Sequence, residues 1–378
     1  MDSIVREEIT QAGGRITLAR FMELALYHPE FGYYLSADRK PGRGGDFLTS
    51  PEASPLYGIT VSRQIVEFWE RMGRAADFSI REYGSGVGGL AYDILAGLSD
   101  AAPDLFASVK YRLVERNRNR QAEALTAFRD VGLIDHIIDE SDASLGPIRG
   151  VILANEVSDA FPAHRLTFEA GRLREAWVVP AGDGFRFEDG PVSAEGEAAI
   201  QQLTDGGVVL VEGGVYDVSP DASTWFRGAC RHLERGYALV IDYGYEATEL
   251  YRNHRLAGTL RGYFEHTVTD EPLSNVGNQD LTTHVDFTAL RHAGEEAGLT
   301  FAGLTTQGAF LAGLGLGDHL IAMQAESGTS MSDYLATQAV VARLIDPGGL
   351  GRFRILIMAR DAPIEPPLRG FSVPPPPF

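Results

Sequence analysis

The residues best suited to chemistry form one short stretch, Glu82-Tyr83-Gly84-Ser85-Gly86-Val87-Gly88-Gly89. It follows the apolar segment 78–80 and precedes the helix-like segment 90–98, a pattern that predicts a strand, a tight turn and a helix start. Glycines in such a turn allow positive φ and close approach of a ligand, and the N–H groups at the helix start face that ligand. The sequence therefore predicts that Gly84, Ser85, Gly86 and Gly88 bind a nucleotide-like cofactor.

The glycines alone do not identify the cofactor, because Gly84, Gly86 and Gly89 also fit the dinucleotide pattern G-x-G-x-x-G. Glu82 favours a different ligand from NAD. At the carboxyl end of a strand it would repel a pyrophosphate and attract a cation. S-adenosylmethionine carries an ammonium and a sulfonium but no phosphate, so Glu82 is predicted to bind this cofactor.

A second landmark is the strand-like segment 109–115, which ends in Glu115. Its carboxylate is suited to accept hydrogen bonds from two ribose hydroxyls, and this serves NAD and S-adenosylmethionine equally well. The competing interpretation is that these glycines and acids occupy ordinary surface turns. Structural context has to separate the two.

The elements that must position these residues alternate in type. Strand-like segments at 109–115, 136–139, 150–154 and 237–242 alternate with helix-like ones at 117–131 and 221–234, which predicts a doubly wound, mostly parallel sheet. In such sheets a ligand lies outside the carboxyl ends of the strands. These ends carry Glu82, Glu115, Asp139, Asn155, Glu156 and Asp242. The edge is therefore predicted to be a site, with Asp139 among its cofactor-binding residues.

The flanking segments complete the predicted organisation. Residues 1–75 are expected to form N-terminal helices, the second capped by Thr17, a lid loop, and a helix from Pro55 to Met72. Residues 76–362 are expected to form the core, closed by strands at 301–305 and 353–358 and helices at 286–297, 309–324 and 331–345.

Two insertions are expected in that core. One, at 164–218, is predicted to contain antiparallel strands at 166–168, 176–179 and 208–211, and the other, at 244–284, is predicted to be a long polar loop. Residues 363–378 are expected to form an extended Pro-rich tail.

Composition narrows the functional classes. The net charge of −19 argues against nonspecific binding to nucleic acid and to anionic membranes. The single cysteine, Cys230, excludes an internal disulfide framework. The sequence shows no signal peptide, transit peptide, membrane span or metal-ligand spacing, so we expect a cytoplasmic protein with no metal and no membrane insertion. The sequence does not predict an oligomeric state.

Longer motifs resemble the MidA-like family of S-adenosylmethionine-dependent methyltransferases. They run in the family's order from about residue 10 to 360: 27–34 (YHPEFGYY), 45–52 (GDFLTSPE), the glycine turn, 155–162 (NEVSDAFP), 242–244 (DYG), 258–263 (GTLRGY) and 280–287 (DLTTHVDF). The resemblance implies a class I methyltransferase sheet with an N-terminal helical lid segment and an inserted antiparallel and helical subdomain. The family's mitochondrial member is a protein arginine methyltransferase that modifies a core subunit of respiratory complex I.

The resemblance implies methylation of an arginine in a protein, with a complex I core subunit as the expected partner. Paired carboxylates suit a guanidinium, because they orient its planar fork and accept the released proton. Glu156 and Asp159 are predicted to do this, with Asn155 positioning substrate or cofactor. The alternative is that both acids cap the next helix or pair with surface arginines.

The segment 46–52 is predicted to fold over the cofactor as a lid. Its hydrogen-bonding side chains are Asp46, Thr49, Ser50 and Glu52. A second interpretation, compatible with the first, is that Thr49 or Ser50 caps the helix that follows.

The chain departs from the family pattern at two places. Ser85, Val87 and Gly89 replace the family's Pro, Arg and Thr in the glycine turn, and Val157 and Ser158 replace two aromatics. These changes leave two alternatives open: a methyltransferase for a small molecule or another side chain, and a noncatalytic assembly chaperone that retains the fold. An NAD-dependent dehydrogenase is the remaining alternative.

Overall fold

The computed structural model describes residues 1–36, 50–141, 146–252, 257–264, 267–325 and 330–375. The chain divides into two compact units. One comprises Met1–Phe47, Val157–Arg227 and Gly244–Ala293, and the other comprises Leu48–Glu156, Gly228–Tyr243 and Gly294–Phe378. We call them the insertion unit and the sheet unit. The domain boundaries predicted from the sequence stay a prediction.

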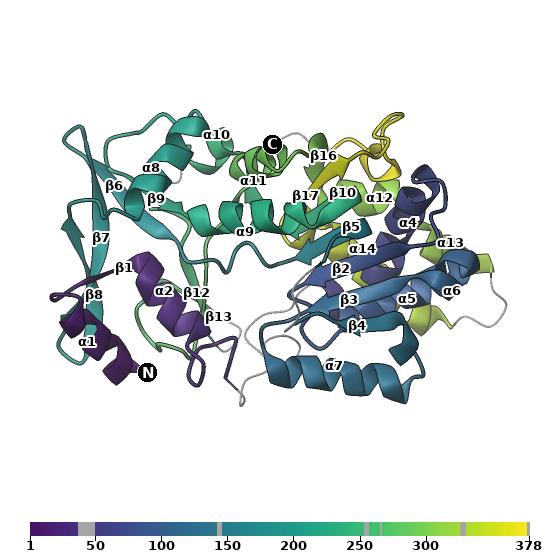
Figure 1. Cartoon of the computed structure of the whole chain (residues 1–378), viewed down its shortest axis with the longest axis horizontal. Helices are drawn as coiled ribbons and strands as arrows, with labels where there is room; N and C mark the ends of the chain where they lie inside the picture. Colours follow the sequence, from purple (N-terminus) through teal and green to yellow (C-terminus); the bar gives the residue numbers. More distant parts are fainter. Residues whose placement is uncertain (37–49, 142–145, 253–256, 265–266, 326–329, 376–378) are drawn as a thin grey trace. The chain divides into compact units, whose positions relative to one another are not determined.

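The sheet unit is built on seven strands in the order β16-β17-β10-β5-β2-β3-β4 (Figure 1). All the strand pairs from β10 to β4 are parallel, and β17 is antiparallel to both of its neighbours. This confirms the predicted doubly wound, class I methyltransferase-type sheet. The strands are β2 (Phe78–Tyr83), β3 (Lys110–Val114), β4 (Ile137–Asp139), β5 (Ile148–Asn155), β10 (Leu233–Asp242), β16 (Thr300–Thr306) and β17 (Arg354–Arg360).

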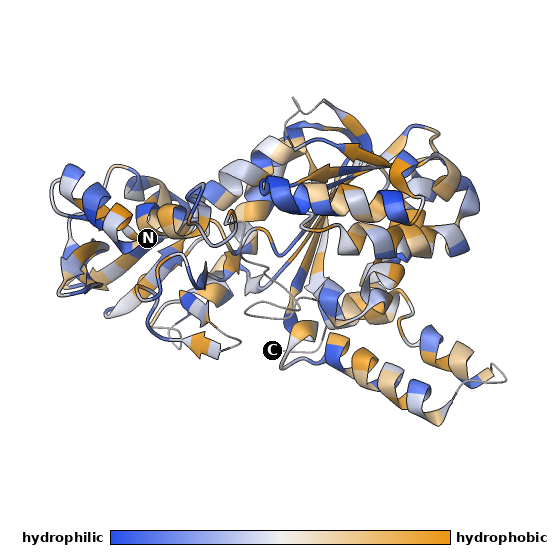
Figure 2. Ribbon diagram, turned by 90° about the horizontal axis from the view of Figure 1, so that it is seen from below, coloured by the Kyte–Doolittle hydropathy of each residue, from blue (hydrophilic) through white to orange (hydrophobic). Residues whose placement is uncertain are grey.

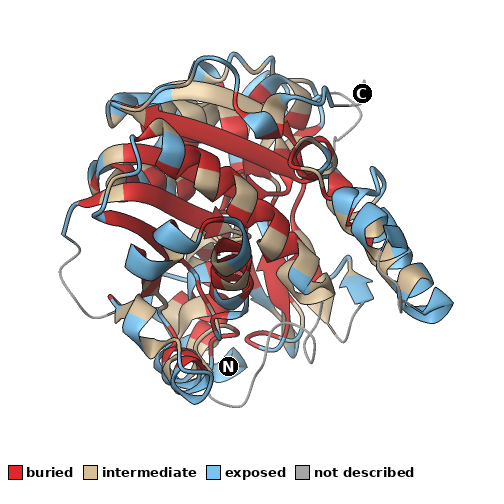
Figure 3. Ribbon diagram, turned by 90° about the vertical axis from the view of Figure 1, so that its right-hand side faces the viewer, coloured by how far each residue is buried: buried red, intermediate tan, exposed pale blue. Residues whose placement is uncertain are grey.

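Helices pack against this sheet through apolar faces (Figure 2), and the strands are largely buried (Figure 3). The helices of the sheet unit are α3 (Ser50–Ala53), α4 (Pro55–Arg71), α5 (Gly89–Ala101), α6 (Pro103–Ser108), α7 (Arg118–Asp130), α12 (Gln307–Gly313), α13 (Asp318–Ala325) and α14 (Met331–Ile345), with short 3-10 turns at Ile134–His136, Leu350–Arg352 and Arg369–Phe371. Of these, α13 has no buried residue and contacts α14. α4 begins where predicted, because Pro55 opens it and the Ser54 hydroxyl accepts a hydrogen bond from the Leu56 N–H at 3.2 Å.

The insertion unit holds a five-stranded antiparallel sheet, in which β7 pairs with β1, β6 and β8, and β6 pairs with β9. Its strands are β1 (Ile16–Thr17), β6 (His164–Glu169), β7 (Arg172–Ala181), β8 (Gly184–Gly190) and β9 (Gly214–Val218). Its helices are α1 (Asp2–Gln11), α2 (Leu18–Tyr27), α8 (Gly196–Asp205), α10 (Ala247–Leu250) and the greater parts of α9 (Pro220–Arg231) and α11 (Phe287–Glu296). Thr17 caps α2 as predicted, since its hydroxyl accepts a hydrogen bond from the Arg20 N–H at 3.1 Å.

Several local predictions are wrong. Residues 208–211 form no strand: they follow the paired glycines that end α8, and Val209 is 80% exposed. The segment 244–284 is not a plain loop, because it contains β11 (Gly244–Tyr245), α10, β12 (Arg261–Phe264), β13 (Thr267–Thr269) and β14 (Asp280–Thr282), and β15 (Val285–Asp286) then pairs with β11.

Two further differences lie near the C-terminus. The helix predicted at 309–324 is two helices, separated where Gly315 adopts a φ of 79°. The Pro-rich tail packs onto α4 for part of its length, where the Gly370 N–H donates to Gln64 and Leu368 is buried. Composition alone does not reveal such a contact.

Candidate functional site

The strand order places a switch point between β2 and β5, because the chain winds from β2 towards β3 and β4 and then returns to β5 on the other side. Ligands of open α/β sheets bind at such a point, outside the carboxyl ends of the strands. In the register of the sheet, Tyr83 at the end of β2 lies opposite Ala154 in β5. The glycine turn and Asn155 therefore follow directly at the same edge.

The glycine turn has the backbone that the sequence predicts. Gly84, Gly86 and Gly88 have φ values of 68°, 55° and 81°, a region that side chains disfavour. A Cβ on Gly88 would lie 2.7 Å from Cε2 of Phe128. Glycine is thus required there both by conformation and by space.

Ser85 in the same turn is buried, and its hydroxyl has no hydrogen-bond partner among the described residues. Buried polar groups are almost always hydrogen bonded, so a buried hydroxyl without a partner in the glycine turn indicates that a group of a ligand binds there. Beside it, α5 begins at Gly89 with no side-chain cap, which leaves N–H groups of its first turn suited to a carboxylate such as that of a methionine moiety.

Glu115 follows β3 and is tied to the glycine turn. Its Oε2 accepts a hydrogen bond from the Gly86 N–H at 2.8 Å, and its Oε1 accepts one from the Asn117 N–H at 2.7 Å. A carboxylate has about four acceptor positions, so both oxygens retain capacity for the hydroxyls of a ribose. The predicted role of Glu115 is compatible with this geometry.

Asp139 and Glu140 at the end of β4 have different environments. Asp139 is exposed, and its Oδ1 accepts from Gln121 at 2.8 Å and from the Ser141 N–H at 3.0 Å. Glu140, which the sequence analysis overlooked, is buried and forms a two-pronged ion pair with Arg81 at 2.6 and 3.0 Å. Arg112 adds a third contact at 2.8 Å.

The electrostatics of Glu140 follow from these contacts. Burial alone would raise the pKa of Glu140, but the hydrogen bonds and charges of Arg81 and Arg112 outweigh it, and the pKa is lowered. Glu140 is therefore an ionised structural residue.

Glu82 is more deeply buried than the sequence suggests. Its side chain is 3% exposed, and Oε2 accepts a hydrogen bond from the Tyr111 hydroxyl at 2.8 Å. Burial raises the pKa of Glu82 to about 8, against the lowering effect of the Tyr111 hydrogen bond, and the charge of Glu115 raises it further. Glu82 is thus mostly neutral at pH 7, and a neighbouring cation would favour its ionised form.

Asn155, the last residue of β5, and Glu156, which follows it, belong to one connected hydrogen-bond network. The Tyr57 hydroxyl donates to Oδ1 of Asn155 at 2.7 Å, and Nδ2 of Asn155 donates to Oε1 of Glu156 at 3.2 Å. The Ser50 N–H donates to the same Glu156 oxygen at 3.3 Å. Glu156 has a φ of 53°, which is strained for a residue with a long side chain, and such strain clusters at functional sites.

Asp159 lies in the insertion unit, whereas Glu156 is the last residue of its segment in the sheet unit. Asp159 is 2% exposed, and its carbonyl accepts a hydrogen bond from the Thr283 N–H at 3.0 Å. Its charge contributes to a raised pKa of Tyr34, although burial of the phenol and the charge of Asp280 contribute more. The predicted pairing of Glu156 with Asp159 stays a prediction.

The predicted lid falls partly outside the described residues, since Asp46 and Thr49 belong to the segment 37–49. Ser50 is the first residue of α3 and is buried, with its hydroxyl donating to Oε1 of Gln307 at 3.0 Å. Glu52 lies in the same short helix and is half-buried. The lid function itself stays a prediction.

The sequence analysis did not identify Tyr57 as part of the site. Its position in the first turn of α4 reads as one more apolar residue of an amphipathic helix, and its partner Asn155 lies 98 positions away in sequence. The available signal was the hydroxyl, because a buried tyrosine usually finds a hydrogen-bond partner.

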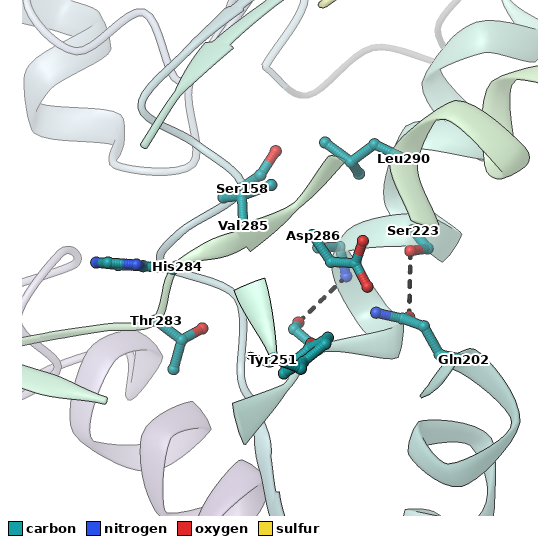
Figure 4. Close-up of a pocket in the computed structure, with 11 residues that line it drawn as sticks. Ser158, Gln202, Ser223, Tyr251, Thr283, His284, Val285, Asp286 and Leu290 are labelled. Carbon is teal, nitrogen blue, oxygen red and sulfur yellow. Dashed lines mark hydrogen bonds between the residues drawn. The ribbon is translucent and has the colours of Figure 1, made fainter. Parts of the chain in front are cut away.

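The insertion unit contains a separate small polar cavity (Figure 4). Asp286 lines it together with Tyr251, Gln202 and Ser223, and the last two are hydrogen bonded at 3.3 Å. The Asp286 Oδ1 caps α11 by accepting from the Ala289 N–H at 3.0 Å, and burial raises the pKa of Asp286 to about 6. None of the residues that line this cavity is among those predicted to bind the cofactor.

A sheet of this strand order, with a glycine turn at its switch point and an acid after the next strand, defines an S-adenosylmethionine-dependent methyltransferase of the class I fold. The chain belongs to the family described as "Putative S-adenosyl-L-methionine-dependent methyltransferase", whose model matches residues 60–305. This confirms the family resemblance found in the sequence motifs.

Individual relatives agree with this assignment. The chain is 31% identical to the mitochondrial protein arginine methyltransferase NDUFAF7 of Rattus norvegicus over 330 residues, which cover 80% of this chain and 71% of the relative. It is 28% identical to the Drosophila melanogaster homologue over 324 residues, covering 79% and 71%.

A solved structure is similar over almost the whole chain. It is a Burkholderia thailandensis protein bound to S-adenosyl-homocysteine, with 32% identity and a TM-score of 0.86 over 98% of this chain and 94% of that one. S-adenosylmethionine is therefore the cofactor, as predicted.

The described residues contain no group of three or more His, Cys, Asp or Glu side chains placed to hold a metal ion. Among the helices in the described ranges, none has the length and apolar composition needed to cross a bilayer. The predicted cytoplasmic location stays a prediction.

Proposed function

We propose that this protein is a protein arginine N-methyltransferase. Its relatives in rat and fruit fly are named as a protein arginine methyltransferase and a homologue of it. The observation that carries the proposal is the carboxylate of Glu156, held at the switch-point edge of the sheet by Asn155 and by the Ser50 N–H. A fixed carboxylate beside a methyl donor is suited to orient a guanidinium and to accept its proton.

The proposed cofactor site is formed by the turn at 84–88, Glu115, Asp139 and Glu82, with Asp46, Thr49, Ser50 and Glu52 as its lid. Bound S-adenosylmethionine supplies an electrophilic methyl group. The protein's contribution is to place the nucleophile in line with the sulfonium and to exclude water. In the proposal Glu156 and Asp159 hold the guanidinium, and Asn155 positions the substrate or the cofactor.

The proposed substrate is an arginine of a respiratory complex I core subunit, as the family resemblance implies. The test is to incubate the purified chain with S-adenosylmethionine and peptides from such subunits and to locate any added methyl group by mass spectrometry. We expect methylation on arginine. Turnover of a small metabolite with no gain on arginine peptides would instead favour the small-molecule alternative, and calorimetry without binding of S-adenosylmethionine would favour a chaperone.

The role of Glu156 is tested by Glu156→Gln, which keeps the size of the side chain and removes its charge. We expect methyl transfer to fall at least about a hundredfold, within the usual contribution of a general base. Glu70→Gln is the matched control, because Glu70 is an exposed residue of α4 that pairs with Arg74 beyond the end of the helix. Wild-type rates for Glu156→Gln would contradict the proposal.

A further inference from the structure

Tyr57 connects the helix α4 to the proposed catalytic edge. Its side chain is fully buried in the core of the sheet unit, yet its hydroxyl reaches Oδ1 of Asn155 at 2.7 Å. A tyrosine in this position contributes apolar packing through its ring and one directed hydrogen bond through its hydroxyl. The two contributions are separable by experiment.

The Tyr57 hydroxyl acts as a hydrogen-bond donor to Asn155. Burial raises the pKa of Tyr57 well above its ordinary value, and the charges of Glu156, Glu82 and Asp242 raise it further. The phenol therefore keeps its proton, and the amide oxygen of Asn155 rather than its amide nitrogen accepts the hydrogen bond.

Fixing one end of the Asn155 amide fixes the other. With Oδ1 turned to Tyr57, Nδ2 faces Oε1 of Glu156 at 3.2 Å. If the amide turned over, its oxygen would face the carboxylate, and two acceptors would be in contact. The Ser50 N–H donates to the same Glu156 oxygen, so two donors fix the position of Oε1.

We infer that Tyr57 is a positioning residue: its hydroxyl orients the Asn155 amide and, through it, the carboxylate of Glu156. This inference rests on the proposed function for its effect on catalysis, but the orientation itself is a property of the protein without substrate. Tyr57 touches neither the reacting methyl group nor the nucleophile in this proposal. Its effect is therefore expected in turnover rather than in cofactor binding.

The first test is Tyr57→Phe in the full chain, with Tyr237→Phe as the matched control. Tyr237 is also fully buried in the sheet unit, and its hydroxyl donates to the Pro363 carbonyl at 2.6 Å, so the control loses a comparable hydrogen bond elsewhere. The readout is the side-chain N–H₂ signals of protein labelled with ¹⁵N-asparagine, which has six asparagines, with Asn155 assigned by Asn155→Ala. We expect the Asn155 signals to shift in Tyr57→Phe and to exchange with water about tenfold faster.

Unchanged Asn155 signals, or a change no larger than in Tyr237→Phe, would overturn the inference whether or not arginine peptides are methylated. Where they are methylated, we expect Tyr57→Phe to lower kcat about tenfold, the effect of losing one hydrogen bond. KM and the Kd for S-adenosylmethionine should stay within about twofold. In an Asn155→Ala background, Tyr57→Phe should cause no further loss, since its effect passes through Asn155. A full additional tenfold loss in that background would also overturn the inference.

Discussion

The strongest test of the cofactor site uses the raised pKa of Glu82. Its pKa of about 8 means that roughly one copy in a hundred is ionised at pH 6 and about nine in ten at pH 9. If the ionised form faces the charged groups of the cofactor, the affinity for S-adenosylmethionine should rise by up to about ninetyfold between these pH values. In Glu82→Gln this contribution should be absent.

Calorimetric titration of both proteins with S-adenosylmethionine at pH 6, 7, 8 and 9 measures this effect. The ratio of the wild-type affinity to the Glu82→Gln affinity is the informative quantity, because ionisation of the ligand itself cancels from it. We expect the ratio to be near one at pH 6 and to increase up to pH 9. A ratio that is independent of pH would refute the placement of Glu82 beside the cationic cofactor.

The raised pKa of Glu82 also predicts how stability depends on pH. Cofactor affinity should rise with pH, whereas the stability of the cofactor-free protein should fall. The pKa of Glu82 rises from 4.5 in the unfolded chain to about 8 in the fold, so its contribution to stability is fully present below pH 4.5 and is lost as pH rises through 8. The difference corresponds to roughly 5 kcal/mol as an upper limit, at about 1.36 kcal/mol for each pKa unit. Urea unfolding without cofactor at pH 9 should therefore find Glu82→Gln more stable than the wild type. If Glu82→Gln and the wild type differed in stability by the same amount at pH 4.5 and at pH 9, ionisation of the buried carboxyl would not be the cause of the difference.

Three further substitutions test individual contacts. Glu140→Gln should lower the free energy of unfolding by about 3–5 kcal/mol in urea at pH 7, because it leaves the buried guanidinium of Arg81 without its counter-charge; a loss below 1 kcal/mol would contradict this. Gly88→Ala should lower the melting temperature and weaken binding of S-adenosyl-homocysteine, because the new Cβ would lie 2.7 Å from the Phe128 ring and the φ of 81° disfavours a side chain. A Cβ on Gly89 would have nothing within 4 Å, so Gly89→Ala should change neither quantity. Asp286→Asn should be more stable than the wild type by up to about 3 kcal/mol at pH 8 and no more stable at pH 3.5. The reason is that the pKa of Asp286 is raised from 3.8 to about 6, which lowers the stability of the wild type only as pH rises through that interval. Equal unfolding curves at pH 8 would rule this out.

The sequence was sufficient to predict the sheet because its strands are short apolar runs with distinct ends. Each predicted strand from β2 to β5, as well as β10, β16 and β17, was found within a few residues of its predicted position. The polar residues at their carboxyl ends were placed correctly for the same reason, since parallel strands bring those ends to one edge. The two errors at 208–211 and 244–284 lie in the insertion unit. The first segment follows the paired glycines that end α8, and the strands of the second are only two to four residues long.

The environment of each site residue was less predictable than its position. Glu82 was expected to be a charged acid at an open edge, but its burial and the Tyr111 hydrogen bond depend on residues about 30 positions away. The neighbouring acids Asp139 and Glu140 look equivalent in sequence, yet only the second meets the buried guanidinium of Arg81. Side-chain contacts of this kind depend on packing, which local patterns do not specify.

The backbone at Glu156 connects these observations to function. Glycine is the residue that adopts a φ of 53° without strain, and a longer side chain costs of order 1 kcal/mol there. A glycine at this position would relieve the strain, but it would also remove the carboxylate that Asn155 and the Ser50 N–H hold. Folding alone therefore gives no reason for a glutamate at the end of β5. The proposed role of Glu156 in binding a guanidinium gives one, so the strained backbone at this residue agrees with that proposal.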